Sequence, residues 1–303
     1  MRKDKFNVPV LLLIFNRPDI TYRVFEQIRE CRPSRLFIAA DGPREDVPQD
    51  KGKCSQAREI TRAVDWDCNV KTLFREKNLG CGIAPCTAVD WFFENVEYGI
   101  ILEDDCLPHQ TFFRFCEELL KYYKNDQRVM TISGSNFQFG RKPIEYSYYF
   151  SKYTFMWGWA TWRRAWDYFD LNMKVWPKVR DSGLLFNILG DRKEACFWRN
   201  NFEQVFTGKK VTWDYQWQFS SWLQNGLTIV PKVNLVSNIG FGDNSTHTKG
   251  RSVLAGLEGK EIGLSLVHPP YIFPDKLADK INEKYVFNPS RLYKKIINMT
   301  FGH

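Results

Sequence analysis

The sequence contains no long apolar run. Its most apolar N-terminal stretch is VPVLLLIF at residues 8–15, and Pro9 interrupts it. A membrane-spanning helix needs about 20 consecutive apolar residues, and a signal peptide needs an apolar core followed by a cleavage site. We therefore expect neither a membrane span nor an export signal, and we expect the protein to act in the cytoplasm.

Paired cysteines are missing as well. The spacing C-x-x-C is typical of zinc sites, and it does not occur among the eight cysteines, which lie at positions 31, 54, 68, 81, 86, 106, 116 and 196. Disulfides are rare in the cytosol, so we expect reduced thiols, several of them in the core. No internal repeat and no low-complexity tail is visible. With 44% apolar and 16% aromatic residues, the 303-residue chain is expected to bury a substantial core.

The balance of charge is basic. The 43 lysines and arginines exceed the 35 acidic residues, which gives a formal net charge of +8. Such a charge suits an anionic partner but does not choose among a phosphorylated ligand, a nucleic acid and a membrane surface. The tail at 276–303 combines six basic residues with apolar ones. We interpret it as a solvated helix face, and the alternative is a peripheral contact with the inner face of the membrane.

Apolar strands and amphipathic helices alternate through the first third of the chain. We expect strands at 10–15, 35–40, 70–74 and 98–102, with helices between them, and a further helix that begins near Pro108. This alternation predicts an α/β fold, Rossmann-like, with a mainly parallel sheet flanked by helices. From about residue 141 the sequence becomes dense in aromatics. We therefore expect a nucleotide-binding half at 1–140, an acceptor-side α+β half at 141–275 and a basic tail at 276–303.

Three adjacent carboxylates, Glu103, Asp104 and Asp105, follow the strand at 98–102. Carboxylates this close repel one another unless a cation or hydrogen-bond donors compensate. Their hard oxygens favour Mn²⁺ or Mg²⁺, which bind through one or two carboxylates together with phosphate oxygens. The alternative is structural, because acidic residues before a helix N-terminus are also favourable. The metal hypothesis, and the function inferred from it, both fail if neighbouring lysines or arginines already neutralise these oxygens.

Polar residues also follow the first two strands. Asn16 and Arg17 come after the first, and Asp41 comes after the second. Ligands of parallel α/β sheets bind beyond the carboxyl ends of the strands, so these residues and the acidic triplet are expected at one sheet edge. Arg17 suits a phosphate or a base, and Asp41 suits hydrogen bonds from a base or ribose. Ordinary turns before Pro18 and Pro43 are the alternative.

Further candidates lie in the second half. Asp214 stands between Trp213 and Tyr215, and it is a candidate general base whose aromatic neighbours, Trp217 included, would stack on sugar and desolvate the carboxylate. The alternative makes the aromatics core and Asp214 a helix cap. His247 is a candidate metal ligand in a Gly- and Asn-rich loop. The tryptophans at 157, 159, 162 and 166 suggest an acceptor platform or ordinary core, and Arg163 and Arg164 lie among them.

Taken together, these motifs resemble a known family. NVPVLLLIFNRPD, FIAADGPR, GIILEDDCLPHQTFFRFCEELLKYY, SGSNFQFG, FMWGWATWRRAW, and WDYQW followed by IVPKVNLVSNIGFG are similar to motifs of the GT-A fold nucleotide-sugar glycosyltransferases. Their order and spacing resemble the N-acetylglucosaminyltransferase I family. The likeness is piecemeal and spans about residues 8–247. The aromatic segment departs in detail, and the membrane anchor and stem of the eukaryotic members are not seen, so a Golgi location is not implied.

The resemblance implies specific roles. Arg17 and Asp41 match nucleotide-binding positions, Glu103 a donor-sugar contact, Asp104 a ribose contact and Asp105 the direct Mn²⁺ ligand. Asp214 matches the catalytic base, and the loop with His247 matches one that orders over the donor. The implied reaction is metal-dependent, inverting transfer of a sugar, N-acetylglucosamine by family likeness, from a UDP-linked donor to a hydroxyl of a glycan. The acceptor would be lipid-linked or protein-linked.

Two other functions are compatible with parts of the sequence. A non-catalytic carbohydrate-binding protein would need the tryptophans but not the acidic triplet. A nucleic-acid-binding protein would use the positive charge and the aromatics, but its lysines and arginines are expected along one stripe. Here they are distributed and the strand ends are acidic. We therefore predict a glycosyltransferase that does not bind nucleic acid.

Overall fold

The computed structural model describes residues 5–241, 254, 256–263 and 265–288. His247, most of the glycine-rich loop and Arg291, Lys294 and Lys295 of the tail lie outside these residues. Within the described part of the chain, no helix is both long enough and apolar enough to cross a bilayer.

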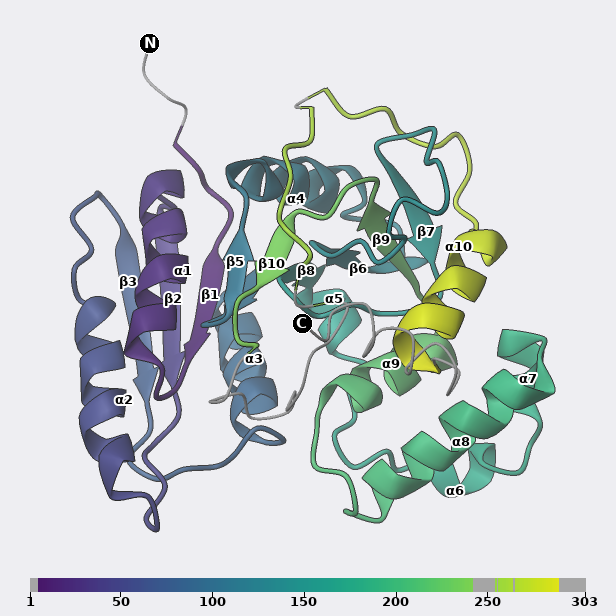
Figure 1. The fold of residues 1–303 in the computed structure, drawn as a ribbon, viewed down its shortest axis with the longest axis horizontal. Helices are drawn as coiled ribbons and strands as arrows, with labels where there is room; N and C mark the ends of the chain where they lie inside the picture. The colour runs from purple at the N-terminus through teal and green to yellow at the C-terminus, as the bar shows by residue number, and fades with distance from the viewer. Residues whose placement is uncertain (1–4, 242–253, 255, 264, 289–303) are drawn as a thin grey trace, which may run out of the picture.

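An eight-stranded sheet forms the centre of the molecule (Figure 1). Four of its seven pairings are parallel, so the predicted α/β fold with a mainly parallel sheet is confirmed. In spatial order the strands are β3 (Asn69–Phe74), β2 (Arg35–Ala40), β1 (Val10–Ile14), β4 (Tyr98–Glu103), β8 (Trp159–Trp162), β6 (Val129–Ser133), β9 (Leu227–Pro231) and β7 (Tyr148–Ser151).

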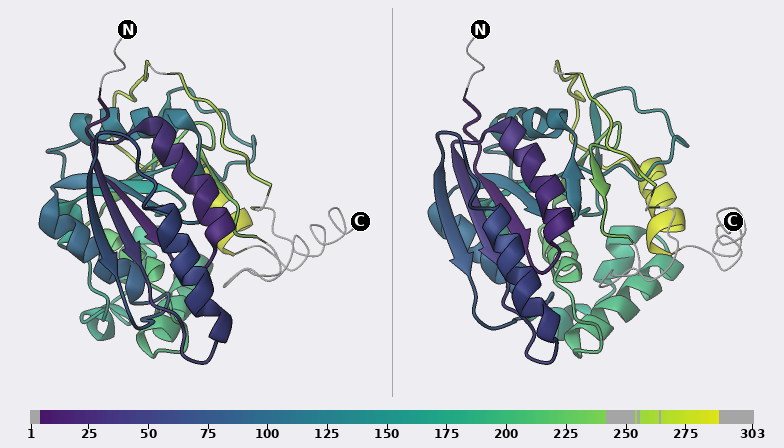
Figure 2. Two further views of the ribbon diagram at one scale, coloured as in Figure 1. Left: turned by 90° about the vertical axis from the view of Figure 1, so that its left-hand side faces the viewer. Right: turned by 60° about the vertical axis from the view of Figure 1, so that its left-hand side comes forward.

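Helices cover both faces of this sheet, as the turned views show (Figure 2). Alternate residues of β1 separate into two cores: Val10, Leu12 and Ile14 face one, and Leu11 and Leu13 face the other. The first core is closed by α1 (Pro18–Cys31), α2 (Pro48–Ile60) and α4 (Gln110–Tyr122). The second is closed by α3 (Ala84–Asn95), α5 (Arg163–Trp166) and the start of α9 (Asp214–Leu223).

A third, strongly aromatic core lies beside the sheet in the second half of the chain. It packs α6 (Trp176–Val179), α7 (Leu184–Leu189), α8 (Arg192–Phe206) and α9 against α10 (Lys276–Asn282) and the following π-helical turn η1 (Glu283–Phe287). Two short strands, β5 (Cys106–Pro108) and β10 (Val236–Asn238), pair antiparallel in a separate two-stranded sheet. The predicted helix after the acidic triplet therefore starts later, because β5 intervenes.

A buried carboxyl group joins α10 to the sheet. The Asp279 side chain is only 3% exposed, and it accepts hydrogen bonds from the Ser151 hydroxyl (2.5 Å) and the Lys152 amide (3.2 Å). Burial raises its pKa to about 7, against the lowering effects of those two bonds and the Lys152 charge; Asp275 adds a smaller increase. The folded state therefore binds a proton between about pH 4 and 7 that the unfolded chain has lost.

This carboxyl group predicts a stability that falls as pH rises. Between the unfolded and folded pKa values of Asp279, deprotonation disfavours the folded state, so its contribution decreases up to about pH 7 and is then constant. Asp279→Asn should remove this pH-dependent change in the free energy of unfolding, which is at most about 4 kcal/mol, and the variant should be more stable than wild type at pH 8. Urea unfolding at several pH values measures it. The exposed Asp167→Asn is the control, and an equal slope in wild type and Asp279→Asn would refute the prediction.

Candidate active site

The acidic triplet lies at the carboxyl end of β4, near the middle of the sheet. Glu103 is the last residue of β4 and aligns with Leu13 of β1. It therefore lies at the carboxyl end of these two parallel strands. The chain then turns through Asp104 and Asp105 into β5. The Asp104 side chain is almost completely buried, and Asp105 is 15% exposed. The triplet therefore lies where ligands of α/β sheets bind.

Arg17 is the cation among these carboxylates. Its guanidinium pairs with Asp104 through Nη2 and through Nε at 3.2 Å, and its Nη1 lies 3.0 Å from Asp105 Oδ2. No Lys or Arg of the described residues pairs with Glu103. Arg17 thus neutralises part of the triplet in this structure, and its nucleotide-binding role stays a prediction. One guanidinium faces three carboxyl groups, so the cluster remains acidic.

Burial and crowding make these acids weaker. The pKa of Glu103 is raised by burial first, then by the charges of Asp105 and Asp104, and Arg17 only partly offsets this. Burial also raises the pKa of Asp104, although its ion pair with Arg17 acts in the opposite direction. The negative charge of Asp214 also raises the pKa of Glu103, as the smallest of these causes.

Asp214 is the first residue of α9, and its carboxylate is held in one orientation. Both the Thr212 hydroxyl and the Tyr215 amide donate to its Oδ1, the latter at 3.0 Å. No hydrogen bond to Oδ2 is found among the described residues, so Oδ2 is the oxygen available to a ligand. The aromatic neighbours differ from the prediction: Trp213 is 6% exposed and Trp217 is fully buried. Both belong to the core and do not form a sugar-stacking surface.

The turn after β3 brings further groups to this site. The thiol of Cys81 has its pKa raised by burial, with smaller contributions from the charges of Glu103, Asp214 and Asp41. Gly82 packs against Val211, next to the loop that holds Asp214; an added Cβ would lie 2.8 Å from Val211 Cγ1. The sequence reasoning missed Cys81 and Thr212. For Thr212 the one signal was its place two residues before Asp214, within reach of that carboxylate.

Gly240, just after β10, closes the site from the opposite direction. A Cβ at this position would clash with Asp105 Oδ2 and would lie 2.9 Å from Arg17 Nη1. The backbone of the second half therefore rests directly on the ion pair. Its preceding residue is fixed as well, because the Ile239 amide donates to the Asp105 carbonyl at 2.8 Å.

Asp41 and Asn16 have structural partners in this structure. The Asp41 carboxylate accepts from the amides of Gly42, Leu79 and Gly80 and from the Asn78 side chain, at distances of 2.9–3.2 Å. It thereby joins the loop after β2 to the turn after β3. Asn16 donates to Asp50 at 2.7 Å, and Arg44 pairs with the same carboxylate. Their nucleotide-binding roles stay predictions.

The bonds of Asp41 predict a loss of stability on truncation. Asp41→Ala would leave three backbone amides without their acceptor, that of Gly42 buried and those of Leu79 and Gly80 partly open to water. Since one unsatisfied buried group costs about 1–3 kcal/mol, we expect at least about 1 kcal/mol of destabilisation, measured by urea unfolding. Asp41→Asn keeps one acceptor oxygen and should lose less. A cost below about 1 kcal/mol for the alanine variant would contradict this assignment.

The predicted tryptophan platform is wrong for three of its four members. Trp159, Trp162 and Trp166 are at most 4% exposed and pack in the cores on either side of β8. Only Trp157 is partly exposed, and it contacts Phe241 with ring centroids 5.7 Å apart.

Arg163 and Arg164, which lie among these tryptophans in the sequence, are bonded to main-chain carbonyls. Arg163 donates to the carbonyls of Phe93 and Val96, and Arg164 donates to the carbonyls of Tyr123, Lys124 and Val129. These two side chains cap main-chain carbonyls near the amino end of β4, the edge opposite to the triplet.

No group of three metal-ligating side chains converges within the described part of the chain. His247, the predicted additional ligand, lies outside it. Mn²⁺ and Mg²⁺ usually retain waters and take only one or two carboxylates, the remaining ligands being phosphate oxygens. Asp105 Oδ1 accepts a hydrogen bond from the Cys106 thiol at 3.6 Å, and Glu103 has no basic partner among the described residues, so both fit that smaller donor set.

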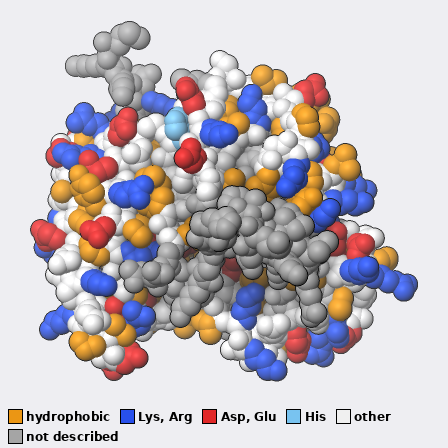
Figure 3. Space-filling model, viewed as in Figure 1, with side chains coloured by type: hydrophobic (Ala, Val, Ile, Leu, Met, Phe, Trp, Pro, Cys, Tyr) orange, Lys and Arg blue, Asp and Glu red, His pale blue; other side chains and the backbone are white. Residues whose placement is uncertain are grey.

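On the face shown in Figure 3, the described residues form no continuous basic stripe. Lysines and arginines alternate there with acidic side chains. A nucleic-acid groove needs positive charge that follows the phosphate backbone. The distribution on this face therefore gives no support to nucleic-acid binding.

Comparisons with known proteins give only distant likenesses. The sequence matches no protein-family model and no curated protein. Among solved structures it is similar to HddC from Yersinia pseudotuberculosis, with 11% identity, a TM-score of 0.28, and 41% of this chain and 56% of that chain covered. It is also similar to a cytidylyltransferase from Leptospira borgpetersenii serovar Hardjo-bovis, with 11% identity, a TM-score of 0.31, and 53% of this chain and 61% of that chain covered. A third similar structure is a UDP-glucose pyrophosphorylase complexed with UDP-glucose, with 14% identity, a TM-score of 0.26, and 48% of this chain and 62% of that chain covered. The matches span 56–62% of these proteins' lengths, and such low TM-scores support no inference about function.

Proposed function

We propose that the protein is a glycosyltransferase that moves a sugar from a nucleoside diphosphate donor to a hydroxyl of a glycan. The observation that supports this proposal is the Glu103–Asp105 triplet at the carboxyl end of β4, where Arg17 pairs with Asp104 and Asp105 and the charge of Asp214 acts on Glu103. An acidic cluster of this kind is costly to maintain, because its members raise one another's pKa values. Strongly perturbed acids in one place indicate a functional site.

The donor end of the site is assigned to the triplet. Asp105 and Glu103 would hold Mn²⁺ or Mg²⁺, which when bound supplies positive charge that stabilises the leaving diphosphate. Arg17 is positioned to share that task, since its guanidinium already lies between Asp104 and Asp105. The nucleotide is taken as UDP, and the transferred sugar as N-acetylglucosamine, on the resemblance of the motifs.

The acceptor end of the site is assigned to Asp214. Inverting transfer requires one base near the attacking hydroxyl, and a single carboxylate is sufficient. Thr212 and the Tyr215 amide fix Oδ1, which leaves Oδ2 to accept the proton of the acceptor hydroxyl. This division gives each carboxylate a separate role.

A ligand screen tests the donor assignment. Melting temperatures are measured with UDP-, GDP-, dTDP- and CMP-sugars, each with and without Mn²⁺. A ligand at 100 times its dissociation constant stabilises the folded state by about 2.7 kcal/mol, so one nucleotide class should raise the melting temperature in a Mn²⁺-dependent way. If no nucleotide sugar shifts it under either condition, the proposal is refuted.

The non-catalytic carbohydrate-binding alternative has lost its main support. It depended on a surface of tryptophans, and three of the four are buried. Such a protein would also have no need for the acidic triplet beside Asp214.

A further inference from the structure

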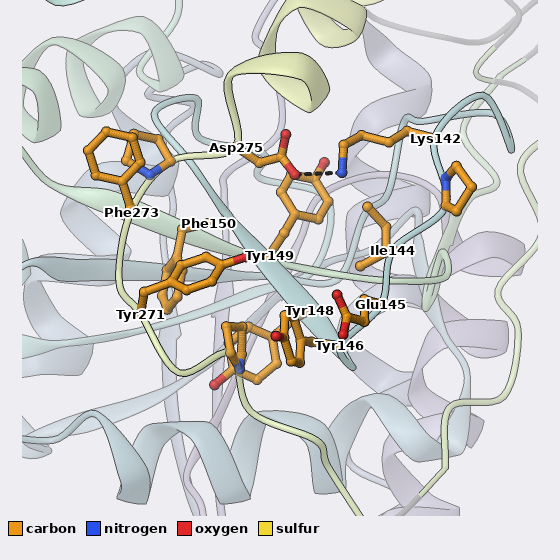
Figure 4. Close-up of a pocket in the computed structure, with 13 residues that line it drawn as sticks. Lys142, Ile144, Glu145, Tyr146, Tyr148, Tyr149, Phe150, Tyr271, Phe273 and Asp275 are labelled. Atoms are coloured by element: carbon orange, nitrogen blue, oxygen red, sulfur yellow. Dashed lines mark ion pairs between the residues drawn. The ribbon is translucent and has the colours of Figure 1, made fainter.

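A cavity of about 510 Å³ lies against β7, the last strand of the sheet (Figure 4). One wall is β7 together with the segment before it, and the other is the stretch at 269–275 near the end of the described chain. Neither wall contains a residue of the acidic site. Because three strands separate β7 from β4, the cavity lies about 19 Å across the sheet from the triplet.

The cavity is built into the backbone. The segment opposite β7 is tied to it at both ends, by the Ser147 amide to the Val267 carbonyl (3.0 Å) and by the Asp275 amide to the Phe150 carbonyl (2.8 Å). Between these ties the chain contains Pro269, Pro270 and Pro274, which have no amide proton to donate to the strand. The segment therefore bows away from β7, and the opening is preformed.

The lining combines exposed rings with charged groups. Tyr271 and Phe273 are 58% and 59% exposed, and they lie on the same side of the cavity in Figure 4. Lys142 and Asp275 form an ion pair at 2.6 Å across one end, and Glu145 lies near Ile144 on the side away from the two rings. One positive and two negative groups make this lining slightly acidic.

We propose that this cavity binds a neutral oligosaccharide, the part of the acceptor glycan remote from the reacting hydroxyl. The proposal rests on the proposed function only for the choice of ligand class. A sugar ring has an apolar C–H face, which packs on an exposed aromatic ring, and hydroxyl groups, which bond to carboxylates and ammonium groups. The net acidic lining disfavours phosphates and anionic lipids, and a wholly apolar ligand would leave the ion pair without solvent.

Two alanine variants test the cavity directly. Wild type is screened against an array of neutral oligosaccharides, and the best binder is titrated calorimetrically against Tyr271→Ala and Phe273→Ala. Each should weaken binding by about threefold to tenfold, the usual contribution of an aromatic contact. Melting temperatures should be unchanged because both rings are exposed. Tyr168→Ala, which removes a ring 48% exposed elsewhere, should bind like wild type.

Asp105→Ala separates this proposal from the function of the acidic site. It should keep oligosaccharide binding and lose Mn²⁺-dependent nucleotide binding. The cavity proposal is overturned if no oligosaccharide binds wild type, if both ring variants bind normally, or if Asp105→Ala alone abolishes binding. If an oligosaccharide binds the cavity and no nucleotide sugar binds anywhere, the cavity proposal survives and the transferase proposal fails.

Discussion

Replacement of Asp214 by asparagine is expected to lower the rate of sugar transfer by about 10³-fold and to leave donor binding intact. Asparagine has nearly the same shape, and its carbonyl can accept the bonds from Thr212 and Tyr215 that now orient Oδ1. It cannot take a proton, and general-base catalysis contributes about 10²–10⁴-fold. Product formation measures the rate, and the donor-induced melting shift measures binding.

The control for this prediction is Asp170→Asn. Asp170 is also an aspartate that accepts backbone amide bonds, from Asn172 and Lys174, but it is not part of the acidic site. The Asp170→Asn variant should transfer sugar at the wild-type rate. Normal turnover by Asp214→Asn would remove Asp214 as the base, whereas loss of both turnover and donor binding would assign it to the donor instead.

Asp105→Ala is expected to reduce Mn²⁺-dependent donor binding by at least about 100-fold, because it removes a carboxylate assigned to the cation. The fold should persist, since Arg17 keeps its two contacts with Asp104. Two titrations measure the effect: Mn²⁺ followed by electron paramagnetic resonance in the presence of the nucleoside diphosphate, and the donor followed by calorimetry.

Asp19→Ala is the matched control, because Asp19 is an exposed aspartate two residues from Arg17 and outside the cluster. Its Mn²⁺ and donor affinities should equal those of wild type. Unchanged Mn²⁺-dependent binding in Asp105→Ala would show that the Asp105 carboxylate does not hold the cation. The assignment of Asp105 to the metal would then be withdrawn.

The first four strands were predictable because their sequences are simple. Each of β1, β2 and β4 is an apolar run that ends at polar residues, as expected for strands covered on both faces. The strand predicted at 35–40 has the observed bounds. The same logic places polar residues at one edge of a parallel sheet, which is how the triplet and Arg17 could be expected together.

The aromatic region was less predictable for a physical reason. All four residues of β8 are buried, so the strand shows no alternation, and its tryptophans at positions 159 and 162 look equally suited to a surface or a core. Whether these tryptophans lie on the surface or in the core depends on β4 and β6, which flank β8 and are distant in sequence.

The internal pairing of the site also escaped prediction. Strand-end reasoning locates Arg17 and Asp41 but not their partners. The contact of Arg17 with Asp104 spans 87 residues, and that of Asp41 with Leu79 spans 38. Such distances are set by how α1 and the turn after β3 pack, and neither leaves a local pattern.

The continuity of the central sheet limits how the protein can move. β8, from the second half of the chain, is hydrogen-bonded along β4, which carries the triplet. Rotating one side of the sheet against the other would therefore break the hydrogen bonds between β4 and β8, unlike in enzymes whose lobes hinge on a linker. Under the proposed function, admission and release of the donor must instead depend on segments outside the sheet, so turnover should be sensitive to changes in loops and insensitive to stiffening of the strands.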